Sequence, residues 1–154
     1  REEVTAVLPA MRLGLQNYLY DVYQEESMAQ GRKLARGQGL GVLRDVIICE
    51  TDEEAMGWWA HGAAFCGAAW FAPFHFGDVL REPGQTVGPD PAEMTRNGTL
   101  LVGTVDTVTR QLEQLVSQTP VEWIFAWMYN GLIPHAVYMR SIELLKTKVL
   151  PRFE

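Results

Sequence analysis

The chain has 154 residues, a length that suits one ordinary domain, and its 47% hydrophobic and 21% charged residues are normal for a globular protein. A net charge of −6 gives no electrostatic reason to bind nucleic acid or an anionic membrane. No apolar run approaches the roughly 20 residues of a membrane span, and no signal peptide is visible. Cys49 and Cys66 lie in apolar segments without metal-ligand spacing, which indicates buried thiols in a reducing cytoplasm.

The N-terminal residues predict helix, strand and helix in that order. Residues 2–13 favour a helix that ends at Gly14, and the letters LQNYL at 15–19 predict a short strand. Residues 20–37 then predict a helix that the following glycines end. Because the chain opens on REEVTAV without a methionine, we expect it to be part of something longer.

Residues 42–49 form the clearest predicted strand. The continuous β-branched run at 46–48 is typical of a parallel strand that is buried on both faces. Thr51 and Glu54 have the spacing of a capping box, so a helix is expected from about Asp52 toward Ala69.

A long irregular stretch is predicted at 71–98, where four prolines interrupt the chain. Structureless loops of this length are uncommon in compact domains and are usually functional or disordered. Aromatic residues and one histidine crowd the beginning of this stretch, namely Phe71, Phe74, His75 and Phe76.

The C-terminal residues predict a helix, a strand and a last helix. Thr104 caps the first helix, whose apolar stripe consists of Val105, Val108, Leu112, Leu115 and Val116. Residues 121–128 predict a strand, and the last helix begins near Pro134, with Met139, Ile142, Leu145 and Val149 expected to face inward. Alternation of this kind predicts an α/β fold with a parallel sheet. Three strands alone would leave an exposed sheet edge, so neighbouring strands must come from elsewhere.

Three stretches in order resemble the luciferase-like flavin-dependent monooxygenases. They are VLRDVIICETDEEA, GTLLVGTVDTVTRQLEQL and WMYNGLIPHAVYMRSIELLKTKVLPRFE. One departure is that Val105 and Asp106 stand where the family usually has Pro-Glu. The resemblance implies a (β/α)8 TIM barrel, which needs about 250 residues. The chain is then expected to be the C-terminal part of that barrel, a single partial domain over residues 1–154 with a long loop at about 71–98.

The same resemblance implies an enzyme that takes reduced FMN from a flavin reductase and oxygenates a small apolar organic substrate with O₂. An F420-dependent oxidoreductase on the same fold is the alternative enzyme. The third alternative is a truncated, non-catalytic barrel that acts as a scaffold or oligomerises. Either the missing N-terminal barrel half or an oligomer partner would complete the sheet.

Site residues follow from the resemblance and from barrel geometry. Phe71, Phe74, His75 and Phe76 are expected to form a substrate wall with one polar handle, or alternatively to pack the loop on the barrel. Trp127, Tyr129 and Asn130 lie at the C-terminal end of the last strand, which is the active face of such barrels. Trp127 and Tyr129 are predicted to bind substrate and Asn130 to bind the flavin, with core packing as the alternative for Trp127. Thr5 is a candidate for the flavin phosphate or an exposed helix threonine. No catalytic residue and no metal ligand is assigned.

Overall fold

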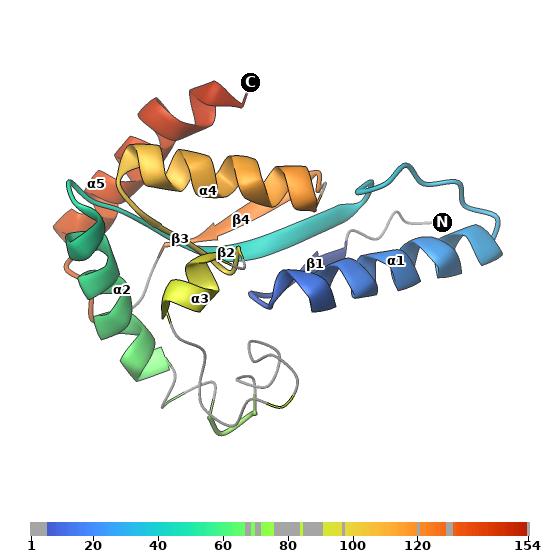
Figure 1. The fold of residues 1–154 in the computed structure, drawn as a ribbon, viewed down its shortest axis with the longest axis horizontal. Coiled ribbons are helices and arrows are strands. Elements are labelled where there is room, and N and C mark those ends of the chain that lie inside the picture. Colours follow the sequence, from blue (N-terminus) through green and yellow to red (C-terminus); the bar gives the residue numbers. More distant parts are fainter. Residues whose placement is uncertain are drawn as a thin grey trace.

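The computed structural model describes residues 6–66, 69, 72–75, 84, 91–96, 98–119, 121–128 and 131–153. Parallel strands alternate with helices along this chain (Figure 1). The elements are β1 (Ala6–Leu8), α1 (Leu13–Ala29), β2 (Leu40–Ile48), α2 (Asp52–Cys66), α3 (Pro91–Arg96), β3 (Leu100–Gly103), α4 (Val105–Gln118), β4 (Trp123–Trp127) and α5 (His135–Leu144). A π-helical turn (Leu145–Val149) and a 3₁₀ turn (Leu150–Arg152) follow α5.

β2 is the centre of the sheet and pairs in parallel with each of the other three strands. β4 pairs with residues 41–45 of β2, whereas β1 pairs with 40–42 and β3 with 45–48. Because β4 overlaps both of the other pairings, it takes one edge of β2, and β1 and β3 share the opposite edge. β1, β2 and β4 are therefore consecutive side-by-side strands. Residues 42–49 and 121–128, each predicted as a strand, contain β2 and β4, and the predicted parallel sheet is confirmed for this pair.

The alternation of side chains along β2 divides the core into two layers. Val42, Val46 and Ile48 pack against α4 and the C-terminal turns, in a cluster that also holds Leu112 and Leu115. Ile47 and Cys49 point to the other face, where α2, α3 and the start of α5 cover them. Figure 1 shows α4 on one side of the sheet and α3 on the other. The prediction of a strand buried on both faces is confirmed for most of β2.

The two predicted helix caps form as expected. The Glu54 N–H donates to Thr51 Oγ1 at 3.1 Å, which is half of the predicted capping box. The Thr107 N–H donates to Thr104 Oγ1 at 3.3 Å at the start of α4. Of the predicted stripe on α4, Val108, Leu112 and Leu115 are buried and the remaining two residues are partly buried.

Sequence reasoning was wrong about the N-terminal elements. Residues 6–8 form a strand, and residues 15–19 lie inside α1. β1 exists because the Ala6 N–H donates to the Gly39 carbonyl and the strand pairs with the start of β2, a contact that no local pattern encodes. α1 buries Gln16, Tyr20 and Ser27, so its helical period is carried mostly by polar residues. It ends at Ala29, before Gly31 with its positive φ of 77°, and not at residue 37.

Two further corrections concern the second half of the chain. Residues 100–103 form β3, which is too short for a periodicity argument, and α3 lies within the range expected to be irregular. On α5, Met139 and Ile142 are exposed, whereas Tyr138, Ser141 and Leu144 are buried. The buried stripe includes a serine because its hydroxyl accepts a hydrogen bond from the Ile48 N–H at 2.9 Å. An apolar period cannot reveal such a position. Among the described helices, none combines the length and the hydropathy needed to cross a bilayer.

Candidate functional site

The carboxyl ends of parallel barrel strands are where such folds place their active sites. At this end, β2 is followed directly by α2, and α2 folds back over the sheet to pack on Ile47 and Cys49. The rest of that sheet surface, over the amino-terminal half of β2, is left open by the described residues. We call it the inner face, and it consists of Val7, Gly41, Leu43, Asp45, Trp123, Phe125 and Trp127.

The inner face is apolar and aromatic. Trp123, Phe125 and Trp127 stand opposite Gly41, Leu43 and Asp45 across the β2–β4 ladder. Their exposed fractions are 54%, 47% and 48%, which is high for large hydrophobic residues. Gly41 leaves room for them, because a Cβ there would lie 3.3 Å from the Phe125 and Trp123 side chains. Parallel sheets are normally covered on both faces, so this surface is suited to contact further strands or an apolar ligand.

Asp45 is the one charged residue of the inner face. It lies beside Trp127 in the ladder, at the border between the open surface and the part covered by α2. Trp59 Nε1 of α2 donates to Asp45 Oδ2 at 2.8 Å. Burial raises the pKa of the Asp45 carboxyl, although the hydrogen bond from Trp59 and the charge of Arg44 oppose this shift. Cys66, at the end of α2, lies close enough that burial and the Asp45 charge together raise the pKa of its thiol.

Arg44, the neighbour of Asp45, points to the opposite side of the sheet and is fully buried. Its Nε donates to the Gly98 carbonyl at 2.6 Å, its Nη1 to the Leu43 carbonyl at 2.8 Å, and its Nη2 to Gln16 Oε1. Burial lowers the pKa of Arg44 to about 10, partly offset by Tyr20 and Asp45. The guanidinium thus joins α1, β2 and the chain before β3, and it holds the middle of β2 in place.

The first residues of α2 and α4 lie at the carboxyl ends of β2 and β3, a region that we call the rim. Asp52, the first residue of α2, accepts hydrogen bonds from the Thr104 N–H at 2.7 Å and from Thr107 Oγ1 at 3.0 Å. Burial alone would raise the pKa of Asp52, but these hydrogen bonds outweigh it and lower the pKa. The N-terminus of α4 therefore already holds an internal anion, which competes there with any phosphate.

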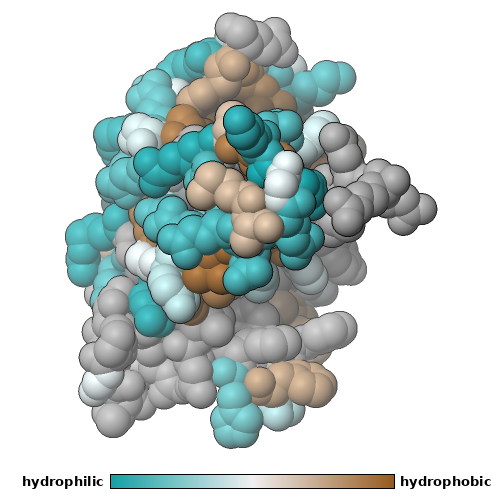
Figure 2. Space-filling view, turned by 90° about the vertical axis from the view of Figure 1, so that its right-hand side faces the viewer, coloured by the Kyte–Doolittle hydropathy of each residue, from teal (hydrophilic) through white to brown (hydrophobic). Residues whose placement is uncertain are grey.

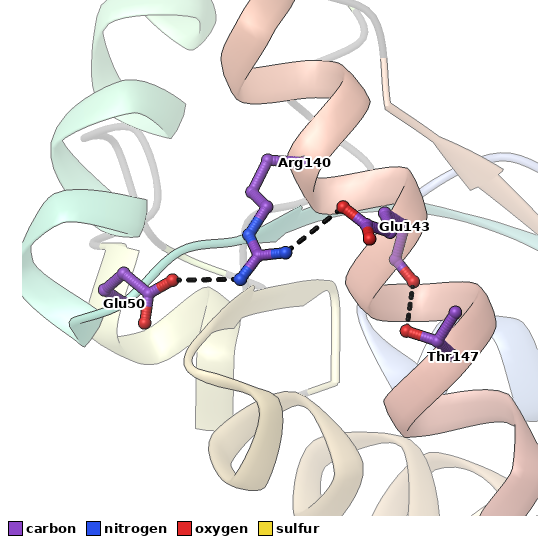
Figure 3. A network of polar contacts seen from close by, with 4 residues as sticks. All are labelled: Glu50, Arg140, Glu143 and Thr147. Atoms are coloured by element: carbon purple, nitrogen blue, oxygen red, sulfur yellow. Dashed lines mark hydrogen bonds and ion pairs between the residues drawn. The ribbon is translucent and has the colours of Figure 1, made fainter.

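A second contact at the rim joins the turn after β2 to α5 (Figure 3). Arg140 pairs with Glu50 at 3.4 Å and with Glu143 at 3.1 Å, and Thr147 Oγ1 donates to the Glu143 carbonyl at 2.7 Å. All three charged side chains are exposed, so the contribution of these pairs to stability is small. Glu50 is thus engaged on the surface and is not directed toward the inner face.

The structure describes three of the predicted site residues. Phe74 and His75 lie on an exposed turn after α2, and His75 has a φ of 58°, an uncommon left-handed conformation for a residue other than glycine. Trp127 lies on the inner face. The other predicted site residues lie outside the described part of the chain, namely Thr5, Phe71, Phe76, Tyr129 and Asn130.

Sequence reasoning missed Asp45 and Trp59. A signal was present, because Arg44 and Asp45 interrupt a strand that was expected to be buried on both faces. Charged residues are almost never buried unless they are paired or hydrogen-bonded, so each of the two needed an explanation.

Two small depressions lie at the opposite end of the strands. One holds about 10 Å³, close to one water molecule, beside Tyr20 and Leu40. The other is a shallow open depression between residues 35–38 and 121–122. Figure 2, turned to the right-hand side of Figure 1, shows mostly hydrophilic described residues with smaller apolar patches between them. Charged and polar residues line much of both depressions, whereas the inner face is apolar and aromatic.

No family model matches the sequence, and no curated protein matches it. Solved structures do match. Monooxygenase RslO1 from Streptomyces bottropensis aligns with a TM-score of 0.74 at 17% identity, covering 96% of this chain and 41% of that one. The oxygenating constituent of 3,6-diketocamphane monooxygenase, a type II Baeyer-Villiger monooxygenase from the CAM plasmid of Pseudomonas putida solved with FMN, aligns at 0.74 and 22% identity, covering 96% and 42%.

The chain has the fold of the luciferase-like flavin-dependent monooxygenases. The expected fold class, a part of a (β/α)8 barrel, is therefore confirmed, and the chain spans about two fifths of the length of these monooxygenases. Within the monooxygenase fold, the aromatic inner face fits one side of a flat flavin ring or an apolar substrate. The described residues fit the flavin phosphate less well, because Asp52 occupies the N-terminus of α4.

Proposed function

We propose that the chain is the C-terminal part of a flavin-dependent monooxygenase that oxygenates an apolar organic substrate with reduced FMN and O₂. The observation that carries the proposal is the apolar, aromatic inner face of a parallel sheet whose fold matches monooxygenases, one of them solved with FMN. The flavin, when bound, supplies the oxygen chemistry, and a flavin reductase supplies its electrons. The same proposal places the protein in the cytoplasm, where a flavin reductase supplies reduced FMN.

This chain would contribute binding, orientation and the exclusion of water. Trp123, Phe125 and Trp127 offer a broad rigid surface for a flat or greasy molecule. α2 covers the neighbouring part of the sheet through Trp59, so water is kept from that end of the strands. The same proposal includes a substrate wall and two flavin contacts. The wall consists of Phe71, Phe74, His75, Phe76 and Tyr129, and the flavin contacts are Thr5 and Asn130.

A complete pocket needs strands beyond those of this chain. All five residues of β4 are exposed, and its outer edge carries no partner strand among the described residues. Open parallel edges and apolar faces are liabilities that proteins normally cover. We propose that the remaining barrel strands cover them, as the N-terminal barrel half or as an oligomer partner.

Flavin titration tests the cofactor. Reduced FMN is titrated into the wild-type chain and into Trp127→Leu and Tyr18→Leu, with bound flavin followed by fluorescence under anaerobic conditions. Trp127→Leu should weaken binding, whereas Tyr18→Leu, an exposed aromatic on α1, should not. Consumption of O₂ with reduced FMN supports the monooxygenase, and hydride transfer with F420 without O₂ consumption supports the alternative oxidoreductase. Equal flavin affinity in all three proteins would contradict the proposed site.

The open sheet also favours a second candidate, a non-catalytic barrel piece that assembles with itself or with another chain. Light scattering combined with the flavin titration separates the two candidates. An oligomer that binds no flavin supports the scaffold, and a species that binds reduced flavin supports the enzyme.

A further inference from the structure

A buried indole donates its N–H to a carboxyl group at the border of the inner face. Trp59 of α2 and Asp45 of β2 are joined by a hydrogen bond of 2.8 Å from Nε1 to Oδ2. Trp59 is only 6% exposed and belongs to the core cluster that covers Ile47 and Cys49. Packing therefore fixes the indole, and its N–H keeps one orientation toward the carboxyl oxygen.

This pair has the geometry of a redox-active tryptophan. Loss of one electron gives an indole ring a positive charge and turns its N–H into a strong acid. A carboxylate in direct contact stabilises that charge, because opposite charges attract more strongly at the low dielectric of a protein than in water. The carboxylate also takes up the proton along the existing hydrogen bond, without movement of either side chain. Trp59 should therefore be easier to oxidise than an indole whose N–H faces water, which is a much weaker base than a carboxylate.

A second tryptophan connects this pair to the open surface. Trp127 of β4 stands opposite Asp45 in the ladder, and 48% of it is exposed. Paired residues of neighbouring strands point to the same face of a sheet, and their backbones lie about 4.8 Å apart. Both indoles thus lie beside one carboxyl group, Trp127 on the open side and Trp59 on the covered side. An electron crosses such a short gap without a bound mediator.

We propose that Trp59 and Asp45 form a proton-coupled redox site that traps oxidising radicals arriving at the inner face. A small radical that takes up one electron oxidises Trp127, which regains its electron from Trp59. The Nε1 proton of Trp59 moves to Oδ2 of Asp45 as the electron leaves. The step yields a reduced oxidant, a neutral tryptophanyl radical at Trp59 and a neutral carboxylic acid at Asp45, so electrons and protons balance. The inference goes beyond the proposed function, because it holds whether or not the chain binds a flavin.

The site works only while Asp45 is ionised. Among the described residues, the charged and titratable groups that interact with its carboxyl are Arg44 on its own strand and Cys66 on α2. The residues opposite Asp45 on β3 and β4 carry no titratable group. Burial raises the pKa of Asp45, whereas the hydrogen bond from Trp59 and the charge of Arg44 lower it. The Cys66 thiol is neutral at physiological pH, since burial and the Asp45 charge raise its pKa. Radical trapping at Trp59 is therefore expected above the pKa of Asp45 and should be lost as pH falls through it.

Pulse radiolysis with azide radicals tests the proposal, since these radicals oxidise tryptophan by one electron. Samples of the full chain are frozen after the pulse, and electron paramagnetic resonance of the wild type and of tryptophan variants assigns the tryptophanyl radical. In the wild type the radical should lie on buried Trp59, although Trp123 is 54% exposed and meets the oxidant more readily. Trp59→Phe should remove this signal, and Trp123→Phe should leave it.

A matched pair of carboxyl variants tests the proton acceptor. Asp45→Asn keeps the size of the side chain but not its basicity, so the yield of radical at Trp59 should fall at least about tenfold, a modest value for opposite charges in contact. Asp21→Asn, which removes an exposed carboxylate from α1, should behave as wild type.

The wild type supplies a second measurement that does not depend on the folding of Asp45→Asn, which circular dichroism checks. Its radical yield at Trp59 should fall as pH drops through the pKa of Asp45, which the indole N–H resonance of Trp59 reports. A wild-type radical on Trp123 in place of Trp59, a yield that does not change with pH, or an unchanged yield in folded Asp45→Asn overturns the proposal.

Discussion

The buried contact between Arg44 and Gln16 allows a quantitative prediction about stability. Arg44 is fully buried, and its pKa of about 10 lies well below its ordinary value. At about 1.4 kcal/mol for each pKa unit, burial of the charge costs about 3 kcal/mol. Gln16 is also fully buried, and its Nε2 has no hydrogen-bond partner among the described residues. Each side chain is therefore costly to bury and depends on the other.

Each single substitution should leave the partner side chain without its hydrogen bond. Arg44→Met removes the charge but leaves the Gly98 carbonyl and Gln16 Oε1 without donors, at about 1–3 kcal/mol each. We expect the removal of the charge to offset part of this cost, for a net loss of about 2 kcal/mol. Gln16→Leu leaves one guanidinium N–H of Arg44 unpaired and should cost a similar amount.

The double variant Gln16→Leu, Arg44→Met should lose less than the sum of the single variants, by about 2 kcal/mol, because neither partner is then left unsatisfied. Urea unfolding at pH 7, followed by tryptophan fluorescence and circular dichroism, measures the three free energies of unfolding. If the losses of the single variants add to that of the double variant within about 0.5 kcal/mol, the hydrogen bond between the two side chains does not carry the network, and the reasoning is refuted.

Three further predictions concern the rim, and urea unfolding measures each of them. Gly103→Ala should lower the free energy of unfolding by at least about 2 kcal/mol, because φ is 149° and a Cβ would lie 2.6 Å from Asp52 Oδ1. Gly57→Ala in α2, where a Cβ would meet nothing within 4 Å, should raise it by about 0.5–1 kcal/mol. Equal effects at the two glycines would contradict the described contact. Thr104→Ala should cost about 1 kcal/mol through the lost cap, while Thr104→Ser stays within a few tenths, and a neutral Thr104→Ala would show that the cap does not contribute. The pKa of Asp52 is lower in the folded chain, so its stabilisation is present above the unfolded pKa and is lost as pH falls through the folded one. Below about pH 4 the wild type should therefore lose more stability than Asp52→Asn. If the free energies of unfolding of the two proteins fall equally with pH in this range, the hydrogen bonds to Asp52 do not contribute to stability.

Local patterns were sufficient to predict much of this chain. The β-branched run at 46–48 predicted β2, and the spacing of Thr51 and Glu54 predicted the start of α2. The stripe on α4 follows from a period of 3.6 residues, because each apolar position repeats within the helix itself. These features depend on residues a few positions apart, so the sequence by itself determined them, together with the alternation that implies a parallel sheet.

Tertiary contacts decided the rest. β1 and β3 have three and four residues, and they are strands because β2 offers them an edge, which is information distant in sequence. α5 buries Ser141 in place of the apolar positions beside it, because a backbone N–H of β2 needs its hydroxyl. The hydrogen bond from Trp59 to Asp45 exists only because α2 folds back across the sheet. Burial and hydrogen bonding are properties of the folded neighbourhood, and no local period in the sequence specifies them.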